Sequence, residues 1–298
     1  MQSKVHKSKD LCLEKEKSMK KIIYSILTIS ITLSAFAQEA ADKKVQAGLV
    51  VGSGLAFQKM GTKNLANDGG NDLTVGANVN FSLSETIGFC TGLEFDFETL
   101  KYTAPGANDD KVYYYFNDTE ILRSQNVELT STSTEVFQLT ERKQKAVYLT
   151  IPTMLTFRTK FFGYFRYFGK FGLRNSFLLK SHVNDAGFTL AGNDFLGAMT
   201  AKTNDNMIIK NETVFFKSAF GLCGGAEWNF SGSTSLVAEL GYYYGFTQLY
   251  WKNDGTVAQI DRETTLFSSG VNNGTGNDVH FSNRATQSQV MLKISILF

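Results

Sequence analysis

From Gln46 onward, apolar residues alternate with polar or small residues over long stretches of the chain. The segment 73–83 has Leu, Val, Ala or Phe at every second position, and 290–298 repeats the pattern at the end of the sequence. A period of two is the signature of a β-strand with one apolar face, whereas an amphipathic helix repeats every 3.6 residues. The alternation therefore predicts an all-β chain.

The same pattern predicts eight strands whose connections alternate in length. The strands are placed at 46–59, 73–84, 86–101, 145–160, 162–180, 212–230, 233–250 and 284–298. The connections near 85, 161 and 231 are short, and those at 60–72, 102–144, 181–211 and 251–283 are long. This arrangement is typical of outer-membrane barrels. We therefore predict an eight-stranded antiparallel transmembrane β-barrel with short periplasmic turns and long extracellular loops.

Soluble β-sandwiches and lipocalin-like barrels also show alternation and are the alternative fold. The predicted segments are longer than the roughly 5–6 residues typical of soluble strands. Aromatic residues also gather near both expected rims: Phe161, Phe162, Trp228, Phe230 and Phe298 on the short-turn side, and Phe57, Phe97, Tyr250 and Trp251 on the loop side. We favour the membrane barrel, because a closed sheet leaves no backbone edge unpaired in lipid.

The N-terminal segment has the features of an export signal. Lys20 and Lys21 precede an apolar run over 22–36, and cleavage is expected between Ala37 and Gln38. Translation is expected to start at Met19, with an N-terminal extension from Met1 as the alternative. The expected organisation is residues 1–18 as a mis-assigned start or extension, 19–37 as the signal peptide and 38–298 as the barrel domain.

Charge and cysteine content exclude several classes of function. Residues 1–37 hold seven of the 30 Lys and Arg residues and three of the 28 Asp and Glu residues, which leaves 23 basic and 25 acidic residues. The positive balance belongs to the signal, so it does not favour nucleic-acid binding. Cys90 and Cys223 alone make no disulfide framework. Because the sequence has neither a metal-type Cys or His cluster nor a phosphate-binding glycine loop, we predict no cofactor and no metal.

Continuing the alternation places charged side chains inside the predicted barrel. The acidic ones are Glu94, Asp96, Glu98, Glu227 and Glu239, and the basic ones are Arg158, Arg166, Lys170, Arg174, Lys217 and Lys293. The interior of an eight-stranded barrel is only just filled by side chains, and a buried unpaired charge is costly. We predict a plugged lumen with a salt-bridge network. A selective channel lined by these charges is the alternative.

The loop at 102–144 contains the aromatic run Tyr113, Tyr114, Tyr115 and Phe116. The alternation at Val127–Thr130 and Thr134–Leu139 predicts a hairpin projecting above the membrane. Exposed aromatics can anchor a partner, or they can pack against neighbouring loops as a lid. We favour the lid, because a loop of this length without a core of its own would be unstable.

Mature histidines are limited to His182 and His280, just outside the fifth and eighth predicted strands. Catalysis would require a carboxylate or Ser partner within hydrogen-bond reach, and sequence proximity to Asp185, Asp278 or Ser282 does not establish one. We expect two ordinary surface residues and no catalytic site.

Short motifs in several strands resemble those of a known family. Tyr148-Leu149-Thr150-Ile151-Pro152 is similar to a Tyr-Leu-x-Ile-Pro strand motif, and Gly221–Glu227 and Glu239–Gly245 are similar to glycine-rich sixth and seventh strands. The family is the Bacteroidota outer-membrane β-barrel family labelled PorT-like or porin-like. The terminal residues Ile294, Ile296 and Phe298 resemble the signal read by the barrel-assembly machinery. The resemblance implies contact with outer-membrane lipid and with that machinery during insertion. Some family members are linked to protein secretion.

Pro152 constrains its strand, because proline cannot donate a hydrogen bond to a neighbouring strand. We expect a bulge or a locally unpaired position there, with early termination of the strand as the alternative.

These observations predict a non-enzymatic protein in the outer membrane of a Gram-negative bacterium, exported by its signal peptide. Its lumen is expected to be filled, and its extracellular loops to act in binding or in an envelope complex with an extracellular or envelope protein. The alternative is a narrow porin or a component of protein export. A rim enzyme ranks third.

Overall fold

The computed structural model describes residues 44–104, 111–122, 134–191, 194–210, 212–231, 234–250, 265–269, 279–280 and 284–298. The signal peptide, the cleavage site at Ala37 and Gln38, the two candidate start residues, Val127–Thr130 and Trp251 lie outside the described residues. Within the described ranges, no helix is long and apolar enough to cross a membrane.

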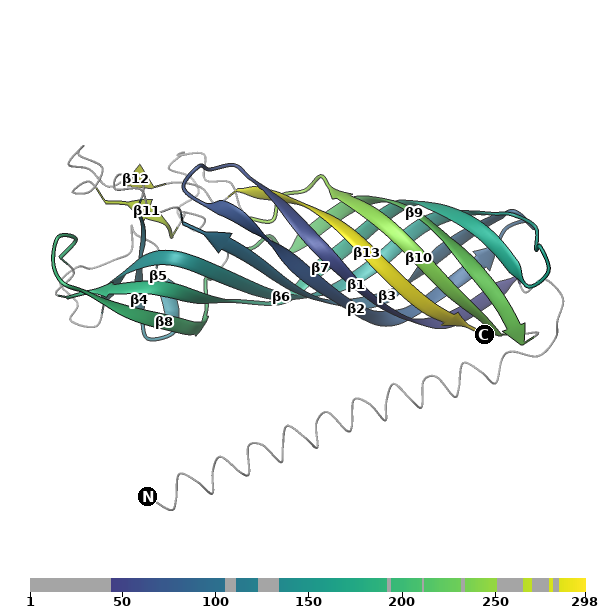
Figure 1. The fold of residues 1–298 in the computed structure, drawn as a ribbon, viewed down its shortest axis with the longest axis horizontal. Helices are drawn as coiled ribbons and strands as arrows, with labels where there is room; N and C mark the ends of the chain where they lie inside the picture. The colour runs from purple at the N-terminus through teal and green to yellow at the C-terminus, as the bar shows by residue number, and fades with distance from the viewer. Residues whose placement is uncertain are drawn as a thin grey trace, which may run out of the picture.

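Eight strands in the described part of the chain form a closed antiparallel ring (Figure 1). They are β1 (Val45–Met60), β2 (Ala66–Ser82), β3 (Ile87–Thr103), β6 (Glu135–Arg158), β7 (Phe165–Leu190), β9 (Phe216–Ser231), β10 (Thr234–Gly245) and β13 (Ala285–Leu297). Each strand pairs with the next, and β13 closes the ring by pairing with β1 from Gly48↔Leu297 to Met60↔Ala285. The predicted eight-stranded barrel is therefore confirmed.

The outer surface of the barrel is apolar and its inner surface is polar. Leu93, Phe95 and Phe97 on β3 are 46–54% exposed, whereas the intervening Glu94 and Asp96 are at most 3% exposed. A surface of this kind is unfavourable in water and favourable in hydrocarbon. The outward apolar side chains form a belt around the barrel, with aromatic clusters near its two rims, as bilayer-spanning barrels require.

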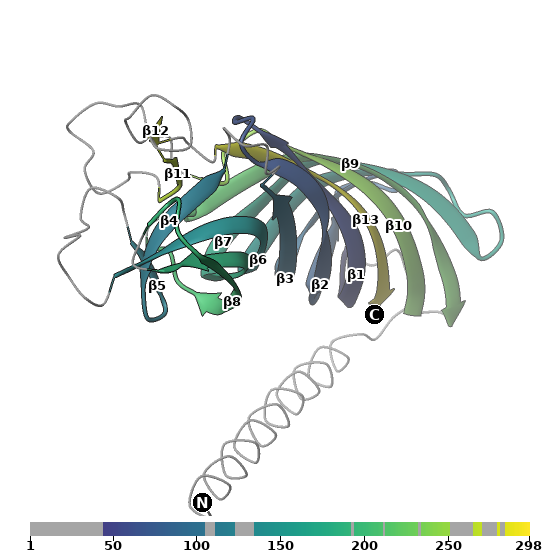
Figure 2. The same ribbon diagram turned by 60° about the vertical axis from the view of Figure 1, so that its left-hand side comes forward.

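β6 and β7 are longer than predicted, at 24 and 26 residues. Beyond the barrel they join β4 (Val112–Asn117), β5 (Glu120–Leu122), β8 (Met199–Met207), β11 (Phe267–Ser268) and β12 (Val279–His280). We call these five strands, with residues 135–145 of β6 and 181–190 of β7, the extension. Figures 1 and 2 show it at the end of the barrel opposite the C-terminus. This is the end with the long loops, which in outer-membrane barrels is the extracellular one. Much of the predicted loops 102–144 and 181–211 is therefore sheet.

Pro152 lies at a local interruption of the ladder between β3 and β6. The pairs Thr91↔Thr153 and Glu94↔Thr150 flank it in one register, and no pair joins Ile151 or Pro152 to β3. The register shift on the β7 side lies further along, between Val147 and Tyr148. Pro152 therefore occupies a locally unpaired position without a bulge. Early termination of the strand, the alternative expectation, is wrong, because β6 continues to Arg158.

Candidate functional site

Arg174 on β7 is the centre of the polar lumen and is 2% exposed. Its Nη2 donates to Asp96 Oδ1 at 2.6 Å, to Thr74 Oγ1 at 3.1 Å and to Glu94 Oε2 at 3.2 Å. Its Nη1 donates to Gln289 Oε1 at 3.2 Å. These partners come from β2, β3 and β13, so one guanidinium group connects opposite walls of the barrel. Its positive charge also lies against the negative charges of two carboxylates.

Two lysines extend this network along the lumen. Lys293 Nζ lies 2.8 Å from both carboxylate oxygens of Glu94, and Lys170 Nζ donates to Glu239 Oε2 at 2.6 Å. Glu94 is therefore shared between Arg174 and Lys293. Charge-assisted hydrogen bonds of this kind are stronger than neutral ones, and they offset the cost of burying the ions.

The remaining predicted lumen residues pair toward the two ends. Arg166 binds Glu227 with both Nε and Nη2, at 2.7 and 2.8 Å, near the short turns. Arg158 Nη1 donates to Ser82 Oγ at 3.1 Å at the same end. Lys217 pairs with Glu98 toward the extension. All eleven charged residues assigned to the lumen from the sequence thus face the interior.

Asp72 is a further lumen residue, absent from the set predicted from sequence, and it is 1% exposed inside the barrel. Its Oδ2 accepts a hydrogen bond from Gln289 Nε2 at 3.1 Å and lies 3.8 Å from Arg174 Nη1. The second strand was predicted to begin at Leu73, which left Asp72 in a loop. The signal was present, because extending the alternation by one residue turns Asp72 inward. Its inclusion gives six acidic and six basic side chains in place of five and six.

A second buried layer lies at the extracellular end of the lumen. Tyr250 and Leu249, which follow β10, pack with Leu100, Tyr102 and Ala285. The Tyr250 hydroxyl is hydrogen-bonded to the Tyr102 hydroxyl and donates to the Gln144 side-chain oxygen. Tyr250 lies near the loop-side rim, as predicted, but on the inside of the barrel, where it is 2% exposed. Its ring is buried because the phenol finds polar partners inside the barrel mouth.

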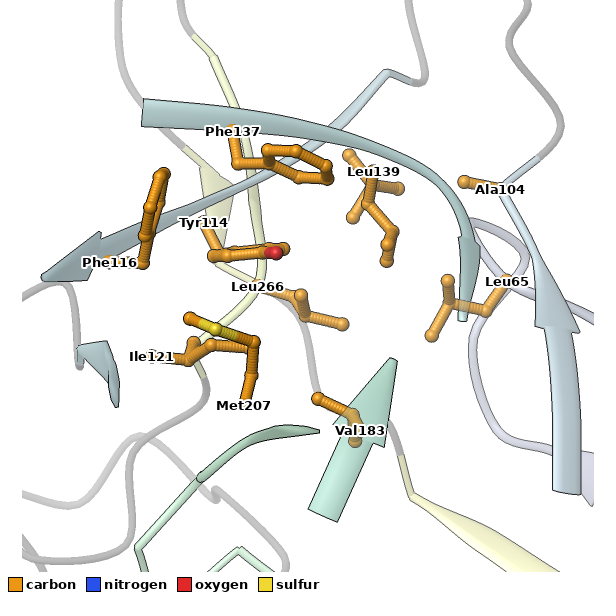
Figure 3. Close-up of a cluster of buried hydrophobic side chains, with 11 residues drawn as sticks. Leu65, Ala104, Tyr114, Phe116, Ile121, Phe137, Leu139, Val183, Met207 and Leu266 are labelled. Atoms are coloured by element: carbon orange, nitrogen blue, oxygen red, sulfur yellow. The ribbon is translucent and has the colours of Figure 1, made fainter. Parts of the chain in front are cut away.

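The aromatic run of the second loop is buried in the extension. Tyr113 and Tyr114 are fully buried, and Tyr115 and Phe116 nearly so. Figure 3 shows the cluster formed on one side of β4; its members include Tyr114, Phe116, Ile121, Phe137, Leu139, Val183, Met207 and Leu266. The interpretation of the four aromatics as exposed anchors for a partner is wrong, because an apolar core encloses them.

The other side of β4 packs against segments from two further predicted loops. The Tyr115 ring stacks on Phe267 with centroids 4.9 Å apart, and the Tyr113 ring meets the edge of Phe195 at 5.1 Å. The aromatic run therefore connects neighbouring loops, which is the packing expected of the lid interpretation. β4 is covered on both faces, and residues from other predicted loops complete both sides of its core.

Arg142 and Asp185 form a buried ion pair in the extension. Nε donates to Oδ1 at 2.9 Å and Nη2 donates to Oδ2 at 2.8 Å. Burial alone would lower the pKa of Arg142, but the Asp185 charge and these bonds raise the pKa above its ordinary value. The guanidinium also lies 5.5 Å from the Tyr114 ring centroid, and burial raises the pKa of that phenol. Arg142 is therefore protonated and the Tyr114 phenol neutral at physiological pH.

His182 does not form the pair with Asp185 that was considered from the sequence, and Asp278 and Ser282, the candidate partners of His280, lie outside the described residues. His182 lies on the outer face of β7, while Asp185 is engaged by Arg142. The His280 ring lies 5.6 Å from Phe267 in the extension. In the described residues, no group of three or more His, Cys, Asp or Glu side chains could hold a metal ion. Cys90 and Cys223 are buried free thiols that pack with Met154, Tyr243 and Met291 in the lumen.

The ring of eight strands, its apolar outer belt and its charged interior define an integral outer-membrane β-barrel. The chain belongs to the outer membrane protein beta-barrel domain family, whose profile matches residues 36–250. This membership places the protein in the outer membrane. No curated protein sequence matches the chain significantly.

The chain is similar to several solved structures at low identity and low TM-score. Ail, the attachment invasion locus protein of Yersinia pestis, is 9% identical over 86% of this chain and 99% of its own, with a TM-score of 0.28. OprG from Pseudomonas aeruginosa is 8% identical over 85% and 92%, with a TM-score of 0.34. The outer membrane protease OmpT from Escherichia coli is 9% identical over 88% and 99%, with a TM-score of 0.33.

Proposed function

We propose that this chain is a non-enzymatic outer-membrane protein with a filled lumen that acts through its extracellular extension. The extension would bind an extracellular or envelope protein, or hold a place in an envelope complex. The observation that carries the proposal is the position of Arg174, buried at the centre of the barrel and bonded to residues on three other strands.

The geometry of the lumen supports closure at two levels. Ion conduction requires sites that release an ion easily, whereas Arg174, Lys293 and Lys170 are each held by direct contacts with carboxylates. The layer of Tyr250 and Leu249 lies above them. A cavity of about 20 Å³ beside Arg174 has room for about one water molecule. It is too small for a hydrated ion to pass.

The surface of the extension supports a role in binding. Leu196 is 76% exposed, and Met199 and Ile208 are also exposed, although all three lie beyond the membrane belt. Apolar side chains in water favour contact with another molecule. β8, which carries Met199, lies at one end of the strand order, and most of its residues are exposed. An extended partner segment could add to such an edge.

Planar-bilayer conductance of the refolded chain tests the closed lumen. Heat-modifiable gel mobility first establishes that the barrel has folded. We expect no steady current from the folded barrel. A steady, ion-selective current would overturn the proposal and favour a narrow porin or an export component.

Site-specific crosslinking in intact cells tests the role of the extension. A photoreactive amino acid at Leu196 is compared with one at Phe162, which is 67% exposed but lies at the periplasmic rim. We expect a discrete adduct from position 196 and a different pattern from 162. The same adducts from both positions, or none from 196, would contradict binding through the extension.

A further inference from the structure

The outward face of three adjacent strands changes from apolar to basic at the extracellular edge of the belt. On β3 the sequence of outward residues runs from Phe97 through Thr99 to Lys101, and on β6 from Val147 to Lys145 and Lys143. On β7, Lys180 follows the exposed Leu179. Each strand therefore presents lysine within one or two outward positions of its last lipid-facing side chain.

Strand register brings these lysines together. Lys101 is directly opposite Lys143, and Thr99 is opposite Lys145. On the other side of β6, Lys145 is opposite His182, and Val147 is opposite Lys180. Like charges in cross-strand positions destabilise a sheet. We call Lys101, Lys143, Lys145 and Lys180 the lysine patch.

Carboxylates of the described chain leave the patch unneutralised. Lys202 and Lys210, elsewhere on the extension, pair with Glu135 and Glu120. Among the described residues, no ion pair joins a patch lysine to a carboxylate. Two exposed carboxylates, Glu141 and Asp205, line one surface pocket with Lys143, while Asp185 is buried with Arg142.

The surroundings of the patch fix its depth relative to the membrane. Phe177 packs with Phe215 and Phe216 at centroid distances of 5.9 and 5.3 Å, just below Lys180. Aromatic girdles of barrel proteins lie at the level of the lipid headgroups. The long lysine stems reach along apolar surface while the ammonium groups stay in the polar layer. The patch thus lies where lipid phosphates are concentrated.

We propose that the lysine patch binds the phosphate groups of lipids in the outer leaflet of the membrane. A lipid phosphate would lie between the ammonium groups of neighbouring strands while its acyl chains cover Phe97, Val147 and Leu179. Lysine binds phosphate as a compact point charge, so a phosphomonoester is favoured over a zwitterionic headgroup. This role is independent of the filled lumen and of any partner on the extension.

The test is a lipid titration of the refolded full chain in neutral detergent micelles, with bound lipids counted by native mass spectrometry. The probes are phosphatidic acid, which has a phosphomonoester, and phosphatidylcholine. The variant is Lys143→Gln/Lys145→Gln, and the matched control is Lys44→Gln/Lys160→Gln at the periplasmic end. Heat-modifiable mobility verifies that each variant is folded, and Lys101→Gln serves as a single-site check.

We expect the wild type to retain phosphatidic acid in preference to phosphatidylcholine. The patch variant should lose affinity by about fivefold for each lysine removed, and the control should change by less than about twofold. Equal losses in both double variants, or unchanged binding in the patch variant, would overturn the proposal. Full displacement by equimolar inorganic phosphate would also overturn it, because the site would then bind the free anion rather than a lipid.

Discussion

Arg142 and Asp185 are directly opposite each other on β6 and β7 and are joined by two parallel hydrogen bonds. Removing one partner of such a buried pair costs about 3–5 kcal/mol, because the other charge stays buried and unpaired. We expect Asp185→Asn to open the extension while the barrel stays folded. Hydrogen exchange of the β4 and β8 amides measures this opening. The control is Lys202→Gln, which breaks an exposed pair with Glu135 and should cost less than about 1 kcal/mol. An equal loss of protection from hydrogen exchange in both variants would contradict the prediction.

Charge reversal at Lys170 tests the lumen network. Lys170→Glu removes the ammonium group that lies 2.6 Å from Glu239 Oε2 and buries a second carboxylate beside it. We expect destabilisation by about 3–5 kcal/mol, seen as a lower temperature of the gel-mobility transition, with no gain of conductance. The exchange Lys170→Glu/Glu239→Lys should recover part of the loss. Arg174→Glu should be more damaging, since Arg174 contacts two carboxylates closely. An altered ion selectivity in any of these variants would show that the lumen is open.

Truncation of Phe137 tests the core of the extension. Its ring lies 5.1 Å from Tyr114 and 6.1 Å from Phe116, centroid to centroid. Phe137→Ala should cost about 3–5 kcal/mol locally by leaving a cavity. Limited proteolysis should then cut the extension faster, without a change in the barrel's heat-modifiable mobility. Phe162→Ala, at an exposed rim position, is the control. Resistance equal to the wild type would argue against a shared core.

Deletion of Phe298 tests the C-terminal assembly signal. The Phe298 amide donates to the Ala47 carbonyl at 2.8 Å, so it contributes one hydrogen bond to the β1–β13 seam. A single hydrogen bond contributes only about 1 kcal/mol, and the folded barrel should tolerate its loss. We expect a marked decrease in the rate of insertion by the assembly machinery, with little change in unassisted insertion into detergent. Phe298→Tyr should keep the signal. Unaffected assisted insertion would refute it.

His182 supplies a prediction of pH dependence. Burial, Lys180 and Lys145 lower the pKa of His182 below its ordinary 6.5. The folded state therefore binds a proton less readily than the unfolded chain does. The stability contributed by neutral His182 is present above pH 6.5 and is lost as the pH falls toward the lowered value. Lys145→Gln should raise the pKa of His182, as measured by NMR titration of the ring, and Lys44→Gln should leave it unchanged. A lower pKa in Lys145→Gln would contradict the assigned cause.

The barrel was predictable from sequence because lipid and lumen impose opposite demands on successive residues. Beyond the membrane and the lumen, the alternation of apolar and polar residues ends as well. Residues 140–145 are polar on both faces of β6, and Val136–Leu139 are buried on both faces. Neither stretch has one apolar, lipid-facing side and one polar, lumen-facing side, although the strand is continuous. The Arg142–Asp185 pair was therefore not predicted, since both residues lie in segments that the sequence pattern assigned to loops. Pairing between distant segments, such as Tyr115 with Phe267, leaves no local pattern.

The length of β6 and β7 has a mechanical consequence. At about 3.4 Å per residue, each strand follows a path of roughly 80 Å from the short-turn end of the barrel into the extension. The extension is therefore a rigid continuation of two barrel strands, β6 and β7. A force applied to the extension at the cell surface would run along β6 and β7. The hydrogen bonds between strands would distribute this force over the neighbouring strands of the ring. The force needed to detach the extension from the cell would then depend on how strongly the lipid bilayer retains the barrel.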